Sequence, residues 1–153
     1  MTSSMSKMAG KENGFTLIEM LLVVAIISLI TVVGAPIFLS FQATNELDVA
    51  RNTIAQYLYE AQSYSRDEDH DCQWGVTISS QQLTLFCGSS YATRNTAYDI
   101  SYSIPSSVVV QHSLEVTYSK LYGLPQTTGS FNLSTTGGQS TSVSVNTKGM
   151  VEY

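Results

Sequence analysis

Hydrophobic residues follow three different patterns along the 153-residue chain. Residues 15–41 form an almost unbroken apolar run whose only charged residue is Glu19. From Ala43 to about Arg66, apolar residues recur every three or four positions, which is the period of a half-buried α-helix. From Trp74 onward the period falls to two, which is typical of β-strands. The pattern predicts an α+β chain in which one long helix precedes a small antiparallel β-sheet domain.

The apolar run is long enough to cross a membrane as a helix. The 20 residues from 20 to 39 match the ~30 Å hydrocarbon core of a bilayer. Lys7 and Lys11 precede the run and the segment after it is acidic, so residues 1–14 are expected in the cytoplasm and the remainder outside. A cleaved secretory signal peptide fits poorly, because the run is too long and residues 40–42 form no small-x-small site. The run alone fits an ordinary membrane anchor.

Glu19 is the feature that an ordinary anchor leaves unexplained. A charged carboxylate costs roughly 2.5–3.5 kcal/mol at the centre of a spanning helix and less near its end. No basic residue lies in the helical turns beside Glu19. We therefore expect its partner to come from another molecule.

Residues 14–19, with the sequence GFTLIE, resemble the class III prepilin signal of the type IV pilin and pseudopilin family. The resemblance covers residues 7–41: a short basic leader that ends in Gly, an aromatic first mature residue, and a Glu five residues into the mature chain. It implies that prepilin peptidase cuts between Gly14 and Phe15 and that the new amine of Phe15 is N-methylated. It also implies a single-pass inner-membrane precursor with a cytoplasmic N-terminus, which an assembly platform protein later builds into an extracytoplasmic filament of pilin subunits.

The same resemblance gives assembly roles to residues inside the apolar run. Glu19 would attract the positive amine of Phe15 in the neighbouring subunit and set the axial offset between subunits, since a buried carboxylate is tolerated once it is paired. Gly34 and Pro36 disfavour helix interiors by about 1 and 3 kcal/mol relative to Ala. Two interpretations of this helix break stay open: a simple kink, and a stretch that melts when the subunit leaves the bilayer for the filament.

The resemblance also implies the pilin fold and a division of the chain into four parts. These are a prepilin leader at 1–14, a transmembrane and assembly helix at 15–41, an amphipathic helix at 42–66 and an extracytoplasmic β-rich head at 67–153. Met1, Met5 and Met8 are alternative starts, each of which leaves the cleavage site intact.

Alternating residues in the head predict short antiparallel strands. Residues 75–78 and 83–86 flank a polar turn at 79–82 and predict a hairpin. Further alternation predicts strands at 98–104, 108–110, 114–118, 131–133, 143–145 and 150–153. We expect them to form a meander-like sheet whose apolar face buries the second half of the helix.

The two cysteines, Cys72 and Cys87, are candidates for a disulfide. A hairpin centred between Ser79 and Ser80 places them opposite each other, which suits the ~5.5–6 Å between Cα atoms that a disulfide needs. The expected topology puts both outside the cytoplasm, where disulfides persist. We predict a Cys72–Cys87 bond that stabilises the fold by around 3 kcal/mol, against the alternative of two free thiols.

Composition narrows the functional classes. The net charge is −5 and no basic stripe is visible, so nucleic acid is disfavoured as a partner. The acidic run at 67–71 lacks the spaced, glycine-containing pattern of a calcium loop. His70 and His112 lie in no nucleophile or metal motif. We therefore expect a structural protein, without enzymatic activity, cofactor or metal.

The head resembles, more loosely, the H-type minor pseudopilins of type II secretion and their FimT-like pilus relatives. The similarity lies in WGV at 74–76 and in a closing hairpin VSVNTKGMV at 143–151. It implies a minor structural subunit of a type IV pilus or of a type II secretion-like pseudopilus.

A binding module carried on the filament, such as an adhesin or a competence DNA receptor, is the alternative function. Its contact surface would be the loops 88–97 and 119–130, with Arg94 and Lys120 as the evident cations.

Overall fold

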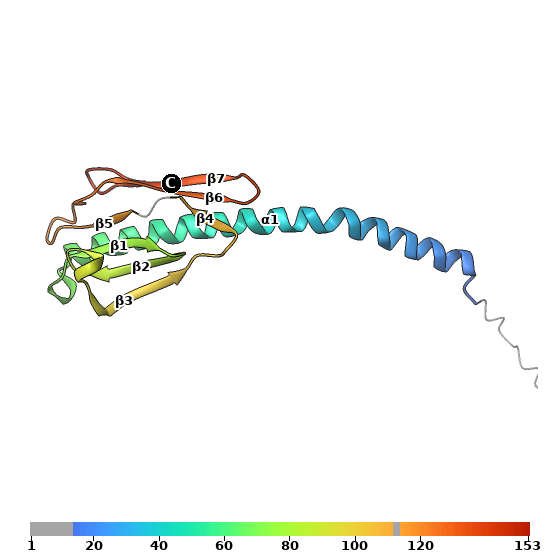
Figure 1. Ribbon diagram of the computed structural model, residues 1–153, viewed down its shortest axis with the longest axis horizontal. Coiled ribbons are helices and arrows are strands. Elements are labelled where there is room, and N and C mark those ends of the chain that lie inside the picture. The colour runs from blue at the N-terminus through green and yellow to red at the C-terminus, as the bar shows by residue number, and fades with distance from the viewer. Residues whose placement is uncertain (1–13, 112–113) are drawn as a thin grey trace, which may run out of the picture. The chain divides into compact units, whose positions relative to one another are not determined.

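The computed structural model describes residues 14–111 and 114–153, without the side chains of residues 33–37. In this part of the chain, one α-helix is followed by eight β-strands and two short 3₁₀ turns (Figure 1). The helix, α1, spans Leu17–Arg66. The chain divides into two compact units, the first ending at Phe38 and the second formed by Leu39–Tyr153. Helix α1 therefore contributes to both units, which are described separately.

The second half of α1 is amphipathic, as its spacing predicts, and the helix ends at Arg66. Its apolar side chains recur in steps of three and four and are buried against the strands: Leu47, Ala50, Ile54, Leu58 and Ala61. Polar residues such as Asn52 and Gln56 occupy the opposite, exposed side. The β-rich part thus uses the helix as one wall of its core.

The strands form two antiparallel sheets, so the expectation of a single meander-like sheet was wrong. The first sheet has the order β3-β2-β1-β5 and the second has the order β4-β6-β7-β8. The strands of the first sheet are β1 (Trp74–Ser79), β2 (Gln82–Cys87), β3 (Asn95–Ser103) and β5 (Glu115–Thr117). Those of the second are β4 (Val108–Val110), β6 (Gly129–Thr135), β7 (Ser140–Val145) and β8 (Val151–Glu152).

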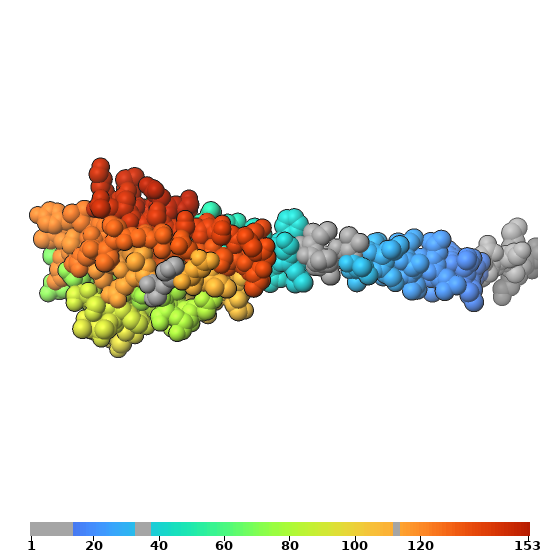
Figure 2. All heavy atoms as spheres, turned by 45° about the horizontal axis from the view of Figure 1, so that its top comes forward, coloured from blue at the N-terminus to red at the C-terminus, as the bar shows by residue number. Residues whose placement is uncertain are grey.

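The strands divide between two sheets because two of them pair with a strand that is not their neighbour in sequence. β5 returns to pair with β1, and β4 pairs with β6 rather than with β3. Alternation identifies a strand and its apolar face, but not its partner, since many pairings bury the same face. Splitting the strands lets the two sheets cover α1 from two sides (Figure 1). Figure 2 shows the two sheets meeting on one face of the second unit, where they leave only a margin of helix visible.

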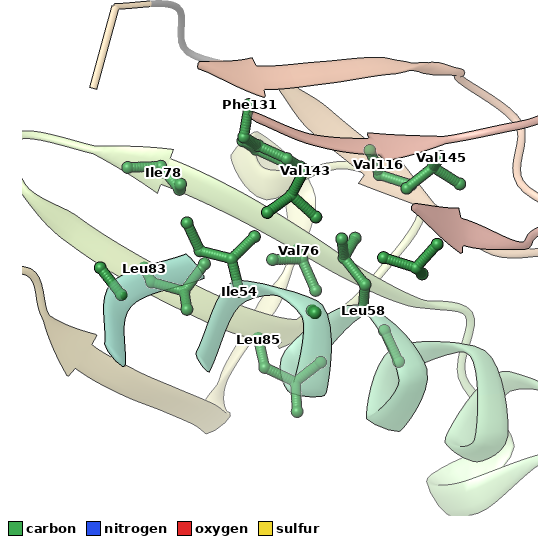
Figure 3. Close-up of a cluster of buried hydrophobic side chains, with 14 of the residues drawn as sticks. Ile54, Leu58, Val76, Ile78, Leu83, Leu85, Val116, Phe131, Val143 and Val145 are labelled. Carbon is green, nitrogen blue, oxygen red and sulfur yellow. The ribbon is translucent and has the colours of Figure 1, made fainter. Parts of the chain in front are cut away.

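One continuous core joins α1 to both sheets. Ile54 and Leu58 of α1 point into the space that separates the sheet of β1 and β2 from the sheet of β6 and β7 (Figure 3). Val76 of β1 and Phe131 of β6 are fully buried there. Burying a large apolar side chain contributes about 1.5–3 kcal/mol, so this shared core holds helix and sheets together.

The hairpin of β1 and β2 has a different register from the expected one. Its turn is the two residues Ser80 and Gln81, whose φ values of 50° and 63° match the left-handed backbone of type I′ hairpin turns. The register pairs Trp74 with Cys87, so the expected centre between Ser79 and Ser80 was wrong by one residue. Neither turn residue is the Asn or Gly that usually marks such a turn, which explains the error.

The Cys72–Cys87 disulfide is nevertheless present, as predicted. Cys72 precedes the first residue of β1 by two positions, and its Cα lies 5.6 Å from that of Cys87. The bond ties the segment after α1 to the end of β2. The free-thiol alternative does not apply in this structure.

The outer face of the first sheet has a small core of its own. Phe86 is fully buried there, and the ring of Tyr91, in the 3₁₀ turn Tyr91–Thr93, meets it edge-on with centroids 5.7 Å apart. A Cβ atom at Gly75 would lie 2.6 Å from Cζ of Phe86 and 2.9 Å from the backbone oxygen of Val116. Glycine at position 75 therefore leaves room for the Phe86 ring beside β1.

Candidate functional site

The expected cleavage point lies just before α1. Phe15 is 81% exposed, and α1 begins two residues later at Leu17. A Cβ atom at Gly14 would meet nothing within 4 Å, and Gly14 does not have a positive φ. The fold therefore does not require glycine at position 14, and a requirement for it would have to come from another molecule. The leader residues 1–13 lie outside the described part of the chain.

Glu19 belongs to the first turn of α1. Its backbone N–H donates to the hydroxyl of Thr16 at 3.3 Å and to the carbonyl of Thr16 at 3.1 Å. Thr16 and Glu19 have the T-x-x-E spacing of a capping box, a signal that the sequence analysis missed. A carboxylate in the first turn also interacts favourably with the helix dipole. The start of the helix thus gives Glu19 a local role. The cap uses its backbone N–H, so the carboxylate stays available for another contact.

The first part of α1 exposes apolar side chains all round its circumference. Each of its large aliphatic side chains is between 44% and 78% exposed: Leu17, Ile18, Met20, Leu21, Leu22, Val23, Val24, Ile26, Ile27, Leu29, Ile30 and Val32. A helix that is hydrophobic on every side is normally buried in protein or lipid. This segment therefore requires cover from outside its own unit.

The polar side chains of this segment separate into two kinds. Ser28 and Thr31 donate to the carbonyls four residues earlier, at 2.7 and 2.8 Å, so they need no external partner. Among the described residues from Leu17 to Val32, Glu19 is the one polar side chain that makes no hydrogen bond or ion pair. A single unpaired charge in an apolar surface requires one complementary charge in whatever covers it.

Within the described residues, the structure contains no helix with the length and apolar character needed to cross a membrane. The expected transmembrane span from 20 to 39 stays a prediction. The helix break at Gly34 and Pro36 stays one too: both residues lie within the bounds of α1, but side chains 33–37 are not described.

The other candidate residues are engaged within the head. Lys120 donates to Asp71 at 2.6 Å, a hydrogen bond that lowers the pKa of the Asp71 carboxyl. Arg94 donates to Asp99 at 2.8 Å, and this bond raises the pKa of Arg94. His70 stacks on the ring of Tyr98 with centroids 4.1 Å apart. No group of three or more His, Cys, Asp or Glu side chains in the described part of the chain could hold a metal ion. His112 lies outside the described residues.

Comparison with known families matches the prokaryotic N-terminal methylation motif to residues 10–35. The match includes the expected cleavage point and Glu19, and it confirms the signal recognised in the sequence. It ends before the β-rich unit begins at Leu39. No curated protein and no solved structure matches the chain. The loose resemblance of the head to minor pseudopilins therefore stays a prediction.

Proposed function

We propose that this chain, a type IV pilin-like precursor by its N-terminal methylation motif, is a structural subunit of an extracytoplasmic filament. Prepilin peptidase cuts after Gly14, the amine of Phe15 is methylated, and the apolar part of α1 packs against sister helices. The bilayer covers the same helix before assembly. We infer a minor subunit of a type IV pilus or of a type II secretion-like pseudopilus.

The observation that carries the proposal is the combination of an exposed apolar helix with a single unpaired carboxylate among its described residues from Leu17 to Val32. Apolar surface at about 25 cal/mol per Å² gives the helix a strong drive to be covered. Because such packing is non-directional, it does not by itself fix the offset between neighbouring helices. One buried charge does, since only one offset places a cation against Glu19. The new amine at Phe15, four residues away in sequence, is a cation of this kind in the neighbouring subunit.

N-terminal sequencing and intact mass of the protein sheared from the cell surface test the processing. We expect a chain that begins at Phe15, heavier by one methyl group and lighter by the two hydrogens lost at the Cys72–Cys87 disulfide. Its abundance in the sheared fraction, relative to the main subunit, would distinguish a minor from a major pilin. An uncut chain that is found in the membrane alone would refute the proposal.

Replacement of Glu19 by Gln tests the assembly step separately. Glu19→Gln keeps the shape and the apolar surface but removes the charge, so we expect normal cleavage with at least tenfold less subunit in filaments. Glu152→Gln, on the exposed end of β8, is the matched control and should assemble normally. Filaments that contain normal amounts of the Glu19→Gln protein would contradict the pairing.

The alternative of a DNA receptor gains little support from the loops 88–97 and 119–130. The two cations on its expected loops, Arg94 and Lys120, are already paired with Asp99 and Asp71. DNA phosphates would have to compete with these carboxylates, which lowers the expected affinity.

A further inference from the structure

The second unit carries an open groove along the exposed side of α1. The groove has a volume of about 460 Å³, within the range of pockets that bind small molecules. Its described lining consists of α1 residues between Asn52 and Tyr64 together with Tyr153, which follows β8. The expected filament contact, which uses residues 15–41, involves none of these residues.

Among the described residues, three tyrosine rings line the groove, and each is held by a contact inside the unit. The hydroxyl of Tyr59 donates to the carbonyl of Val151 at 3.3 Å. The ring of Tyr64 rests against Trp74 with centroids 5.1 Å apart. The guanidinium of Arg51 lies 5.8 Å from the centre of the Tyr153 ring. Rings fixed in this way offer apolar faces at little cost in side-chain entropy.

A stripe of hydrogen-bonding groups lies between the rings. Asn52, Gln56 and Glu60 follow one another at intervals of four on α1, so they share one face of the helix. Gln56 donates to Glu60 at 2.9 Å, which orients both side chains. Among the described residues the Asn52 amide has no hydrogen-bond partner, and it is exposed. The stripe therefore presents amide donors, amide acceptors and carboxylate acceptors within reach of aromatic faces.

The aromatic rings and polar side chains of the groove indicate which class of ligand it can bind. Glu60 is the one charged side chain among the described residues that line the groove, so an anion is disfavoured. An apolar helix is a poor occupant, because it would bury amides and a carboxylate without partners. A sugar ring combines apolar C–H faces, which stack on aromatic rings, with hydroxyl groups that both donate and accept hydrogen bonds. We propose that the groove binds a neutral saccharide, a function that does not depend on filament assembly.

Calorimetric titration of the full-length protein with a panel of neutral oligosaccharides tests the proposal. The protein is kept in a detergent without sugar headgroups, so that the detergent does not compete. We expect at least one oligosaccharide to bind, with affinity unchanged between low and high salt. Tyr153→Ala should weaken that binding at least tenfold. Tyr122→Ala removes a 74% exposed tyrosine outside the groove and should leave it unchanged.

The alternative ligand is a cationic peptide attracted to Glu60. It would bind in low salt, fail in high salt and be lost in Glu60→Gln. That result, or the absence of binding to every oligosaccharide, would overturn the proposal. Equal losses in Tyr153→Ala and Tyr122→Ala would overturn it as well, because binding would then lie outside the groove. None of these outcomes bears on cleavage at Gly14 or on assembly through Glu19.

Discussion

Replacing Tyr118 by Phe should make the second unit more stable. Tyr118 follows β5 and is fully buried in the shared core, and its hydroxyl makes no hydrogen bond with any described residue. A buried polar group without a partner costs about 1–3 kcal/mol, and Phe removes this cost while keeping the ring. The small void left by the oxygen offsets part of the gain. We expect a net stabilisation of about 1 kcal/mol, which raises the melting temperature by about 3 °C.

Tryptophan fluorescence can measure this effect in the full-length protein. Trp74 is the sole tryptophan and is buried in the second unit, so its emission follows the unfolding of that unit. Tyr122→Phe is the matched control, because Tyr122 is 74% exposed and its hydroxyl has water to bind. Its melting temperature should equal that of the wild type.

High pH gives the same prediction a second readout. Burial raises the pKa of Tyr118 well above its ordinary value of about 10. Because the unfolded chain releases this proton near pH 10 while the folded chain retains it, the fold loses stability as the pH rises above about 10. Tyr118→Phe should therefore lose less stability between pH 9 and 11 than the wild type. A melting temperature lowered by several degrees in Tyr118→Phe at neutral pH would refute the reasoning, since it would mean that the hydroxyl has a stabilising partner.

Three further changes probe the head and the N-terminal segment. Cys72→Ser with Cys87→Ser should cost about 3 kcal/mol in urea unfolding, because the disulfide closes a loop with a sequence separation of 15; an unchanged midpoint would contradict this. Gly75→Ala should cost about 1–3 kcal/mol, because its Cβ would meet Phe86 at 2.6 Å, whereas Gly137→Ala, whose Cβ meets its nearest atom at 3.6 Å, should be neutral in the same assay. Thr16→Val removes the hydroxyl that accepts from the Glu19 N–H, so the first turn of α1 should be less stable by about 1 kcal/mol and its amides should exchange faster; unchanged exchange at residues 17–20 would argue against the cap.

The sequence predicts the helix of the head better than the arrangement of its strands. Ile54 and Leu58 lie on one stripe of α1 because helix periodicity is local, and the end at Arg66 follows from the acidic, polar residues after it. Each predicted strand exists, but the pairing of β5 with β1 joins residues about 40 positions apart, which no local pattern encodes. The Cys72–Cys87 bond was predicted from a wrong register. It forms because residues two positions before a strand still lie within reach of its partner.

The candidate site divides in a similar way. GFTLIE at 14–19 is a contiguous signal, so sequence alone located it, and the T-x-x-E cap within it was equally visible but overlooked. The groove along α1 could not be predicted, because it depends on Tyr153 reaching the helix face after the chain has passed through both sheets. That the Tyr118 hydroxyl has no hydrogen-bond partner among the described residues is also a property of packing rather than of spacing.

The boundary between the two units, at Phe38 and Leu39, lies inside a single helix. The methylation motif ends at residue 35, before this boundary, and the groove, the disulfide and both sheets come after it. Mutations that change what the head contacts therefore leave the methylation motif untouched, and the reverse also holds. On the proposed function, subunits with unrelated heads could then join one polymer through a common N-terminal helix, so that gene duplication can diversify the surface of a filament without changing how the filament is built.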